Sequence, residues 1–149
     1  MKKIIIILTL LNLALFLSDW LLIPEPIKEL SQNQFIVEKD MEDQINAYRM
    51  SKGKEVLPEG QWSCGLALVR LSDIKKQTGG LSHKGFSERV RQRNGYNGVG
   101  ENLASGYRSG SEVVSGWIES PLHEDNLVGN WKEMCIHGEN GYWVFIGMT

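Results

Sequence analysis

The sequence predicts an α+β fold, in which helices cover a small antiparallel sheet. Two observations predict it. Apolar residues with helical spacing follow residue 40, and two β-prone runs joined by Asn140-Gly141 lie near the end of the sequence. Strands joined by so short a turn run antiparallel, and the helices bury their apolar faces against the resulting sheet.

The composition fits one small globular domain. Of 149 residues, 42% are hydrophobic and 23% are charged, close to the globular average. The formal net charge of −2 gives no broad basic surface, so no nucleic-acid partner is expected. Two cysteines are too few for a disulfide-dense scaffold or a four-cysteine zinc site. The sequence also lacks the motifs of P-loop and dinucleotide-binding proteins, zinc peptidases and serine hydrolases.

The N-terminal segment has the form of an export signal. Lys2 and Lys3 precede an apolar run, and a second apolar patch ends at Ile23. No A-x-A cleavage site follows, and residues 4–23 have about the length that spans a bilayer. We therefore expect residues 1–23 to be a signal peptide or a membrane anchor. The rest of the chain is expected to be secreted or membrane-anchored and extracellular, meeting the membrane only through an uncleaved segment.

We expect a linker over residues 24–37 and one folded domain over residues 38–149. Pro24 and Pro26 begin the linker, and polar residues continue it. The remaining length is enough for one modest hydrophobic core.

Apolar residues recur at i, i+4 and i+7 in two segments, which predicts two helices with one inward face each. A glycine after each segment marks its end. A short third helix is expected over residues 86–92. The inward faces are formed by Met41, Ile45 and Tyr48, before Gly53, and by Trp62, Leu66 and Val69, before Gly79.

Caps and β-prone runs predict the later elements. Ser109-x-x-Glu112 has the form of a capping box, which opens a helix, and Ser120-Pro121 has the form of an N-cap and first helical residue. In order, we expect a loop over residues 94–100, a strand over 101–104, a helix with Val113, Val114, Trp117 and Ile118 inward, a helix after Ser120, and strands over 134–138 and 142–146.

Two histidines and two glutamates are the candidate functional residues. His83 lies on a loop, His123 lies in the first turn of a helix, Glu101 begins a strand and Glu119 ends a helix. Together they offer an open metal site, with a carboxylate orienting a histidine, or a His–Glu acid–base pair. A structural role for Glu101, which holds His83 or accepts backbone hydrogen bonds, stays open. Spacing alone does not bring the four residues together.

Short motifs over residues 38–147 resemble those of one family. The motifs are Asn46-Ala47-Tyr48-Arg49, Leu81-Ser82-His83, Gly100-Glu101-Asn102-Leu103-Ala104, Ser109 to Trp117, Ser120 to Leu127, and Tyr142-Trp143. Each motif is weak, but their order is that of the CAP superfamily (cysteine-rich secretory proteins, antigen 5 and pathogenesis-related proteins), in its bacterial SCP-like type.

The resemblance implies a three-layer α–β–α sandwich with a small antiparallel sheet, in which His83, Glu101 and His123 line a shared cleft. Glu119 is the nearest match to a fourth residue, a glutamate of eukaryotic relatives. Some relatives bind zinc through the two histidines, so His83 and His123 are the expected metal ligands and zinc the expected cofactor. Other relatives bind sterols or other lipids elsewhere.

Two residues depart from the family pattern. Leu122 stands where relatives usually have glycine, and Glu124 stands where they have arginine. We expect these changes to make the cleft more acidic.

The two cysteines leave two alternatives open. Cys64 and Cys135 pair in an oxidising compartment if the fold brings them together, or they stay as buried thiols. Cys135 and His137 share one face of a strand, but the neighbouring sequence offers no further metal ligand.

The expected function is that of an extracellular CAP-type domain whose His/Glu cleft binds a divalent metal or small ligand. One alternative is a peptidase-like hydrolase, in which His83 and Glu101, or a histidine-bound zinc, activates water. Two histidines are one ligand short of the usual catalytic zinc site, and Glu101 or Glu119 is the candidate third. Another alternative is a structural cell-surface interaction domain. The partner is a small ligand, a lipid or a cell-surface molecule, and the sequence does not decide whether the domain is catalytic.

Overall fold

The computed structural model describes residues 25–91 and 98–149, with side chains from residue 31 onward. The predicted export segment and part of the predicted 94–100 loop lie outside the described residues. The chain forms two compact units, Met1–Phe35 and Ile36–Thr149. The described end of the first unit, residues 25–35, is helical. Within the described ranges, no helix has the length and hydrophobicity needed to cross a membrane.

The segment predicted as a linker is helical from Glu25 onward, because α2 covers Glu25–Ser51. Pro26 lies in the first turn, where a helix needs no amide donor, and the glutamate, lysine and glutamine residues after it favour helix. The polar composition therefore belongs to a helix. The second compact unit begins at Ile36, close to the predicted domain start at residue 38.

The sheet has three antiparallel strands in the order β1-β3-β2. They are β1 (Val99–Ser105), β2 (Glu133–Glu139) and β3 (Tyr142–Met148). The predicted hairpin joins β2 to β3, with Asn140 at φ 53° and Gly141 at φ 78°, as a type I′ turn requires. The predicted antiparallel sheet is confirmed.

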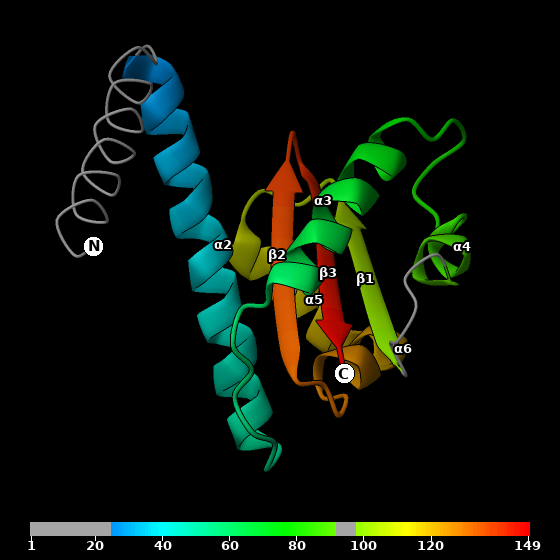
Figure 1. Cartoon of the computed structure of the whole chain (residues 1–149). Coiled ribbons are helices and arrows are strands. Elements are labelled where there is room, and N and C mark those ends of the chain that lie inside the picture. Colours follow the sequence, from blue (N-terminus) through cyan, green and yellow to red (C-terminus); the bar gives the residue numbers. More distant parts are fainter. Residues whose placement is uncertain (1–24, 92–97) are drawn as a thin grey trace, which may run out of the picture. The chain divides into compact units, whose positions relative to one another are not determined.

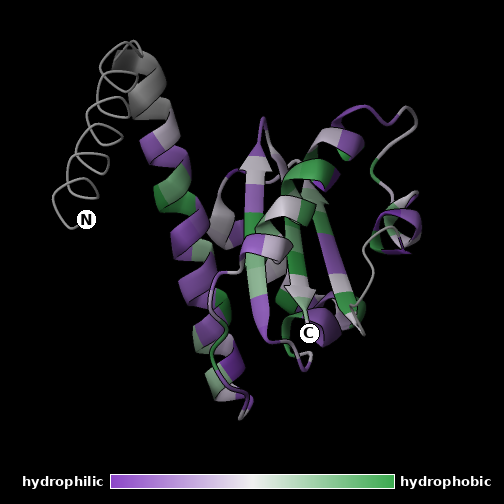
Figure 2. Cartoon of the chain, viewed as in Figure 1, coloured by the Kyte–Doolittle hydropathy of each residue, from purple (hydrophilic) through white to green (hydrophobic). Residues whose placement is uncertain are grey.

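Helices cover both faces of this sheet, which makes the predicted three-layer α–β–α sandwich (Figure 1). On one face, α3 (Gln61–Lys75) and α4 (Phe86–Arg91) pack with Leu103, Val144 and Ile146. On the other face, the part of α2 in the second unit and α5 (Gly110–Glu119) pack with Phe145, and α6 (Pro121–Leu127) contributes Leu127 to the same core. The alternation of side chains along each strand supplies both cores, and Figure 2 shows hydrophobic residues on all three strands.

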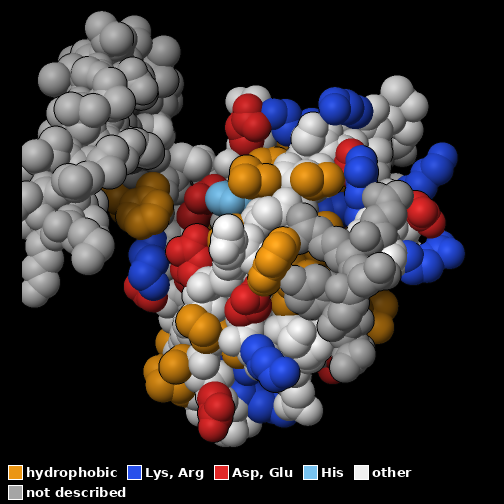
Figure 3. All heavy atoms as spheres, in the orientation of Figure 1, with side chains coloured by type: hydrophobic (Ala, Val, Ile, Leu, Met, Phe, Trp, Pro, Cys, Tyr) orange, Lys and Arg blue, Asp and Glu red, His pale blue; other side chains and the backbone are white. Residues whose placement is uncertain are grey.

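The inward face of α3 differs from the prediction. Trp62 is 56% exposed and Val69 is 37% exposed, so they do not pack the core. The buried stripe instead includes Leu66, Arg70 and Ile74, at i, i+4 and i+8. Hydrophobic side chains consequently reach the surface of the sandwich on the face that carries α3 (Figure 3). Because Arg70 lies in this stripe, the sequence pattern did not show that the stripe is the buried face of α3.

A disulfide joins α3 to β2. The Cys64 and Cys135 sulfurs lie 2.02 Å apart, and their Cα atoms lie 5.0 Å apart. Of the two alternatives for the cysteines, the structure therefore has the paired form and not two buried thiols. Because 71 positions separate them, the bridge closes a long loop and restricts the unfolded chain.

Candidate functional site

The Asn46–Arg49 motif fixes the end of α2. The Asn46 side chain donates to the Leu57 carbonyl and accepts from the Leu57 amide, at 3.0 and 2.8 Å. The buried guanidinium of Arg49 donates to the carbonyl oxygens of Leu127 and Gly129, at 2.7 and 2.9 Å, and burial lowers the pKa of Arg49. These contacts hold the end of α2 against the end of α6, which carries His123.

Glu124 faces α2. Its Oε1 accepts from the Tyr48 hydroxyl at 2.5 Å and from Lys52 Nζ at 2.9 Å, and these two hydrogen bonds lower the pKa of Glu124. Tyr48 and Lys52 thus engage the carboxylate of Glu124, one of the two residues expected to make the cleft more acidic. Leu122, the other departure, is 80% exposed.

Strand β1 sends neighbouring side chains to opposite faces of the sheet. Glu101 points to the face covered by α3, and Asn102 reaches α6, where its Nδ2 donates to the His123 carbonyl at 2.9 Å. Gly100 precedes them because nothing larger fits: a Cβ here lies 2.7 Å from Trp131 Cζ2 and 2.9 Å from Asn126 Oδ1. The Gly100-Glu101-Asn102 motif thus ties the strand to both helical layers.

Glu101 holds His83 and is itself held by Arg70. Glu101 Oε1 lies 2.8 Å from His83 Nδ1. Arg70 donates from Nε to Oε2 at 2.5 Å and from Nη2 to Oε1 at 3.1 Å, and both side chains of this ion pair are buried. Because the carboxylate can only accept, the Nδ1 proton of His83 points to it, so Nε2 is the nitrogen that carries the lone pair when the ring is neutral.

Asn126 locks α6 to β1. Its Nδ2 donates to the Glu101 carbonyl at 3.0 Å and to Asn102 Oδ1 at 2.9 Å, and Trp131 Nε1 donates to its carbonyl at 2.6 Å. This network holds the backbone on either side of His123.

Partial burial lowers the pKa of His123, and the charge of the neighbouring His83 lowers it further, so His123 favours its neutral form.

The structure brings His83 and Glu101 into contact, with His123 close enough for His83 to affect its pKa. Glu119 lies apart, exposed beside a cavity lined by Tyr107 and Ser111. No hydrogen bond or ion pair joins Glu119 to the other three within the described ranges.

Two imidazoles, one of them oriented by a carboxylate, are in their neutral form suitable ligands for a divalent transition metal that completes its coordination with water or a ligand. Glu101 is a poor third ligand, because both of its oxygens are engaged. In the described part of the chain, both groups of three or more candidate ligands within 4.8 Å of one another include Cys135, and neither group includes His83 or His123.

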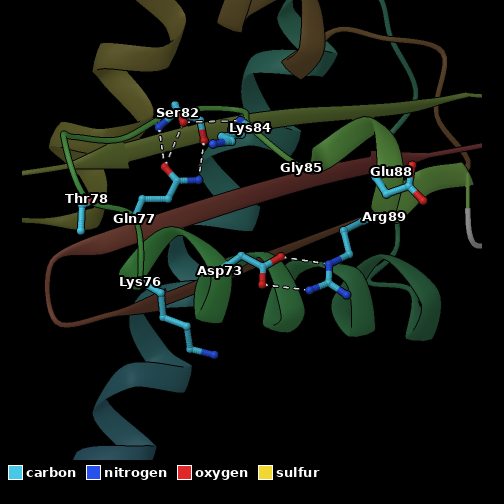
Figure 4. Close-up of a pocket in the computed structure, with 9 residues that line it drawn as sticks. All are labelled: Asp73, Lys76, Gln77, Thr78, Ser82, Lys84, Gly85, Glu88 and Arg89. Atoms are coloured by element: carbon cyan, nitrogen blue, oxygen red, sulfur yellow. Dashed lines mark hydrogen bonds and ion pairs between the residues drawn. The ribbon is translucent and has the colours of Figure 1, made fainter.

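A cavity of about 650 Å³ lies beside the His83 loop. Ser82 and Lys84, the neighbours of His83 in sequence, line it. On one side of Figure 4, Arg89 binds Asp73 with two hydrogen bonds of 3.0 Å; on the other, Gln77 holds the amide and hydroxyl of Ser82. The cavity beside the His83 loop is thus lined by side chains of both positive and negative charge.

Sequence reasoning missed Arg70 and Asn126. The signal for Arg70 was its position in the stripe of Leu66 and Ile74, since a charged residue at a buried helical position requires a partner. Asn126 lies within the recognised motif after Ser120, but its hydrogen bonds to β1 depend on the folded arrangement.

No protein-family model matches the sequence, and no curated protein matches it at a significant level. Solved structures do match. A cysteine-rich secretory protein from Staphylococcus aureus has a TM-score of 0.65 at 17% identity, over 78% of this chain and 38% of its own. An extracellular protein with an SCP domain from Bacillus anthracis has a TM-score of 0.72 at 19% identity, over 81% of this chain and 43% of its own.

An outer surface protein from Borrelia burgdorferi has a TM-score of 0.57 at 19% identity, over 74% of this chain and 88% of its own. The chain spans less than half the length of the Staphylococcus and Bacillus proteins. All three neighbours are extracellular or surface proteins by description. The chain has the fold of the CAP (SCP) domain.

Proposed function

We propose that this chain is an extracellular CAP-type domain in which His83 and His123 bind a divalent metal, zinc above all, together with a small ligand. The observation that carries the proposal is the 2.8 Å contact between His83 Nδ1 and Glu101 Oε1. A carboxylate on one ring nitrogen orients the imidazole and makes the other nitrogen a better metal ligand. The lowered pKa of His123 keeps the second imidazole available near neutral pH.

Three observations support an extracellular location. The N-terminal sequence has the form of an export signal. The Cys64–Cys135 disulfide is typical of proteins in oxidising compartments. The described neighbours in structure are extracellular or surface proteins. We accordingly propose that the domain is secreted or anchored outside the cell.

Hydrolysis is the second candidate function, and one observation favours it. His83, with Nδ1 bound to Glu101, has the orientation of a general base whose Nε2 accepts a proton from water. Glu101 is the positioning residue in this reaction, since Arg70 occupies its oxygens. In this case the cavity beside Ser82 and Lys84 is the place for a substrate with polar groups.

Zinc titration of the full chain tests the proposal, with the disulfide intact and the chain in a mild detergent. Competition with a coloured chelator should give one zinc per chain. His83→Ala and His123→Ala should each weaken zinc binding at least about tenfold, because each removes one of two imidazole ligands. His137→Ala is the matched control and should bind as the unsubstituted chain does. Normal zinc binding by both variants contradicts the proposal, and zinc-independent turnover that His83→Ala abolishes favours the second function.

A further inference from the structure

A second set of metal-ligating side chains surrounds the disulfide. Cys135 and His137 alternate on β2 and share the face that α3 covers, and Cys64 reaches them from α3. The two sulfurs and a ring nitrogen of His137 lie within 4.8 Å of one another. Glu42, Glu59 and Cys135 form a second group with the same limit, so five ligating side chains meet here.

The backbone holds Glu59 beside this group. Glu59 pairs with Met134 in an isolated parallel bridge, in which the Gly60 amide donates to the Met134 carbonyl at 3.1 Å and the Met134 amide donates to the Pro58 carbonyl at 3.0 Å. Glu59 Oε1 consequently lies 3.1 Å from Cys64 Sγ. The next residue of β2 is Cys135, whose Sγ lies 3.9 Å from the same oxygen.

His137 and the acidic groups around it suit a cation. Glu38 Oε1 lies 3.3 Å from His137 Nδ1 and accepts from the Gly138 amide at 2.9 Å, so it orients the imidazole as Glu101 does at the other site. Glu42 adds a further carboxyl group, and its side chain is almost fully buried. A bound cation would compensate charges that otherwise repel one another.

We propose that Cys64, Cys135, His137 and Glu59 form a zinc site when the disulfide is reduced, and that oxidation to the disulfide abolishes it. Two thiolates, an imidazole and a carboxylate are a donor set that zinc accepts. Ligand atoms around a tetrahedral zinc lie roughly 3.3–3.8 Å apart, given bonds of about 2.0–2.3 Å. Glu59 Oε1 lies 3.1 and 3.9 Å from the two sulfurs, near this range. Once the disulfide bond breaks, the two sulfurs must move apart, and the side chains of His137 and Glu59 must turn toward each other, because they belong to separate groups.

The chemistry balances with a dithiol as reductant. One thiolate of the dithiol attacks Cys64 Sγ, and the electron pair of the broken S–S bond leaves on Cys135 Sγ, which takes a proton. The second thiolate of the dithiol then attacks the mixed disulfide, so that the reductant is oxidised and Cys64 becomes a thiol. Zinc displaces one proton from each thiol when it binds.

Access favours attack at Cys64. Cys135 is 0% exposed, whereas Cys64 is half-buried and lines a cavity of about 530 Å³ together with Gly60, Gly65 and Leu68. The reductant therefore reaches the sulfur on α3, and the buried sulfur on β2 is the leaving group.

The test uses the full chain in a mild detergent, with His83→Ala and His123→Ala present so that the first site cannot bind. Cobalt(II) and then zinc are titrated into the oxidised chain and into the chain after reduction by a dithiol and its removal under anaerobic conditions. The reduced chain should bind one cobalt with thiolate-to-cobalt charge-transfer absorption, which zinc then displaces. The oxidised chain should show no such absorption.

Substitutions identify the ligands. His137→Ala and Glu59→Gln should each weaken binding to the reduced chain at least about tenfold, and Cys64→Ser with Cys135→Ser should abolish the charge-transfer absorption. Glu119→Gln, an exposed glutamate elsewhere, is the control and should leave binding unchanged. Circular dichroism shows whether the reduced chain stays folded. If reduction unfolds the chain, the proposal predicts that added zinc refolds it.

Three results would overturn the proposal: a folded, reduced chain that binds no more tightly than the oxidised one, unchanged binding in His137→Ala, or a reduced chain that unfolds and that zinc does not restore. Because the first site is removed in this background, none of these results bears on the function proposed for His83 and His123.

Discussion

Arg70 and Glu101 form a buried ion pair that supports His83. Both of their side chains are at most 1% exposed, and two hydrogen bonds join them. Helix α3 and strand β1 thus meet in a charged contact beneath an otherwise apolar layer. The pair fixes the carboxylate, and the carboxylate fixes the imidazole.

Arg70→Met is expected to destabilise the chain by about 3–5 kcal/mol, because it leaves Glu101 buried without its counter-charge. Urea unfolding measures this loss. Adding Glu101→Leu should recover most of it, since the uncompensated charge is then absent. Arg89→Met is the control: it breaks a more exposed pair with Asp73 and should cost no more than about 1 kcal/mol. An Arg70→Met chain as stable as the Arg89→Met chain contradicts this account of the pair.

Glu101→Gln should lower the zinc affinity of the oxidised chain roughly 10–100-fold, because the amide orients His83 less firmly and adds no basicity to it. Competition titration against a coloured chelator measures the change. Glu124→Gln is the control. It removes a carboxylate that follows His123 in sequence but binds Tyr48 and Lys52, so the zinc affinity should stay unchanged. Equal effects of the two variants would mean that the carboxylates act only through net charge.

Gly100→Ala should destabilise the chain by about 1–3 kcal/mol, the usual cost of overpacking. The added Cβ lies 2.7 Å from Trp131 and must displace its ring. Gly98→Ala is the matched control, since its Cβ meets no atom nearer than 3.4 Å. Thermal unfolding of both variants makes the comparison, and a Gly100→Ala chain as stable as the Gly98→Ala chain would show that the strand has room there.

Glu42 makes stability depend on pH. Burial, and after it the charge of Glu59, raises the pKa of Glu42 from 4.5 to about 7, with smaller effects of Lys39, Asp43 and Glu38. The folded state therefore holds this proton more tightly than the unfolded state, and its contribution is full below about pH 4.5 and lost as pH rises through 7.

Glu42→Gln keeps the neutral form at every pH. Relative to the unsubstituted chain, its stability should rise between pH 4.5 and 7.5 by up to about 3 kcal/mol. Urea unfolding across this range, with the disulfide intact and a chelator present, measures the difference. A difference that does not change with pH would mean that Glu42 titrates normally in the folded chain.

Local signals in the sequence predicted much of the fold. Asn140-Gly141 fixes a hairpin through its own backbone preferences, and the side chain of Ser109 caps α5 by accepting from the Glu112 amide, as the capping box predicts. The prediction that Trp62 faces the core was wrong. Helix α3 has two overlapping stripes of apolar residues, and only packing against the sheet determines which stripe is buried. The segment predicted as a linker, residues 24–37, is helical from Glu25 onward, because polar composition does not distinguish an irregular segment from a helix.

The order of motifs in the sequence predicted which residues are candidates for the site, but not the contacts between them. His83, Glu101 and His123 lie where the motifs predicted titratable groups, but the order of motifs cannot show which carboxylate meets which imidazole. Arg70 meets Glu101 across 31 positions of sequence, and this contact depends on how α3 lies on β1. Glu119 failed to meet the histidines because the end of α5 faces another cavity.

X-ray absorption spectroscopy of zinc bound to the oxidised full chain tests the central claim most directly. With one equivalent of zinc, the account predicts two imidazole nitrogens at about 2.0–2.1 Å, oxygen ligands for the rest, and no sulfur shell at about 2.3 Å. His83→Ala and His123→Ala should each remove one imidazole from the shell, and His137→Ala should remove none. A shell without imidazole, or one that neither His83→Ala nor His123→Ala changes, would contradict the claim that these two histidines hold the metal.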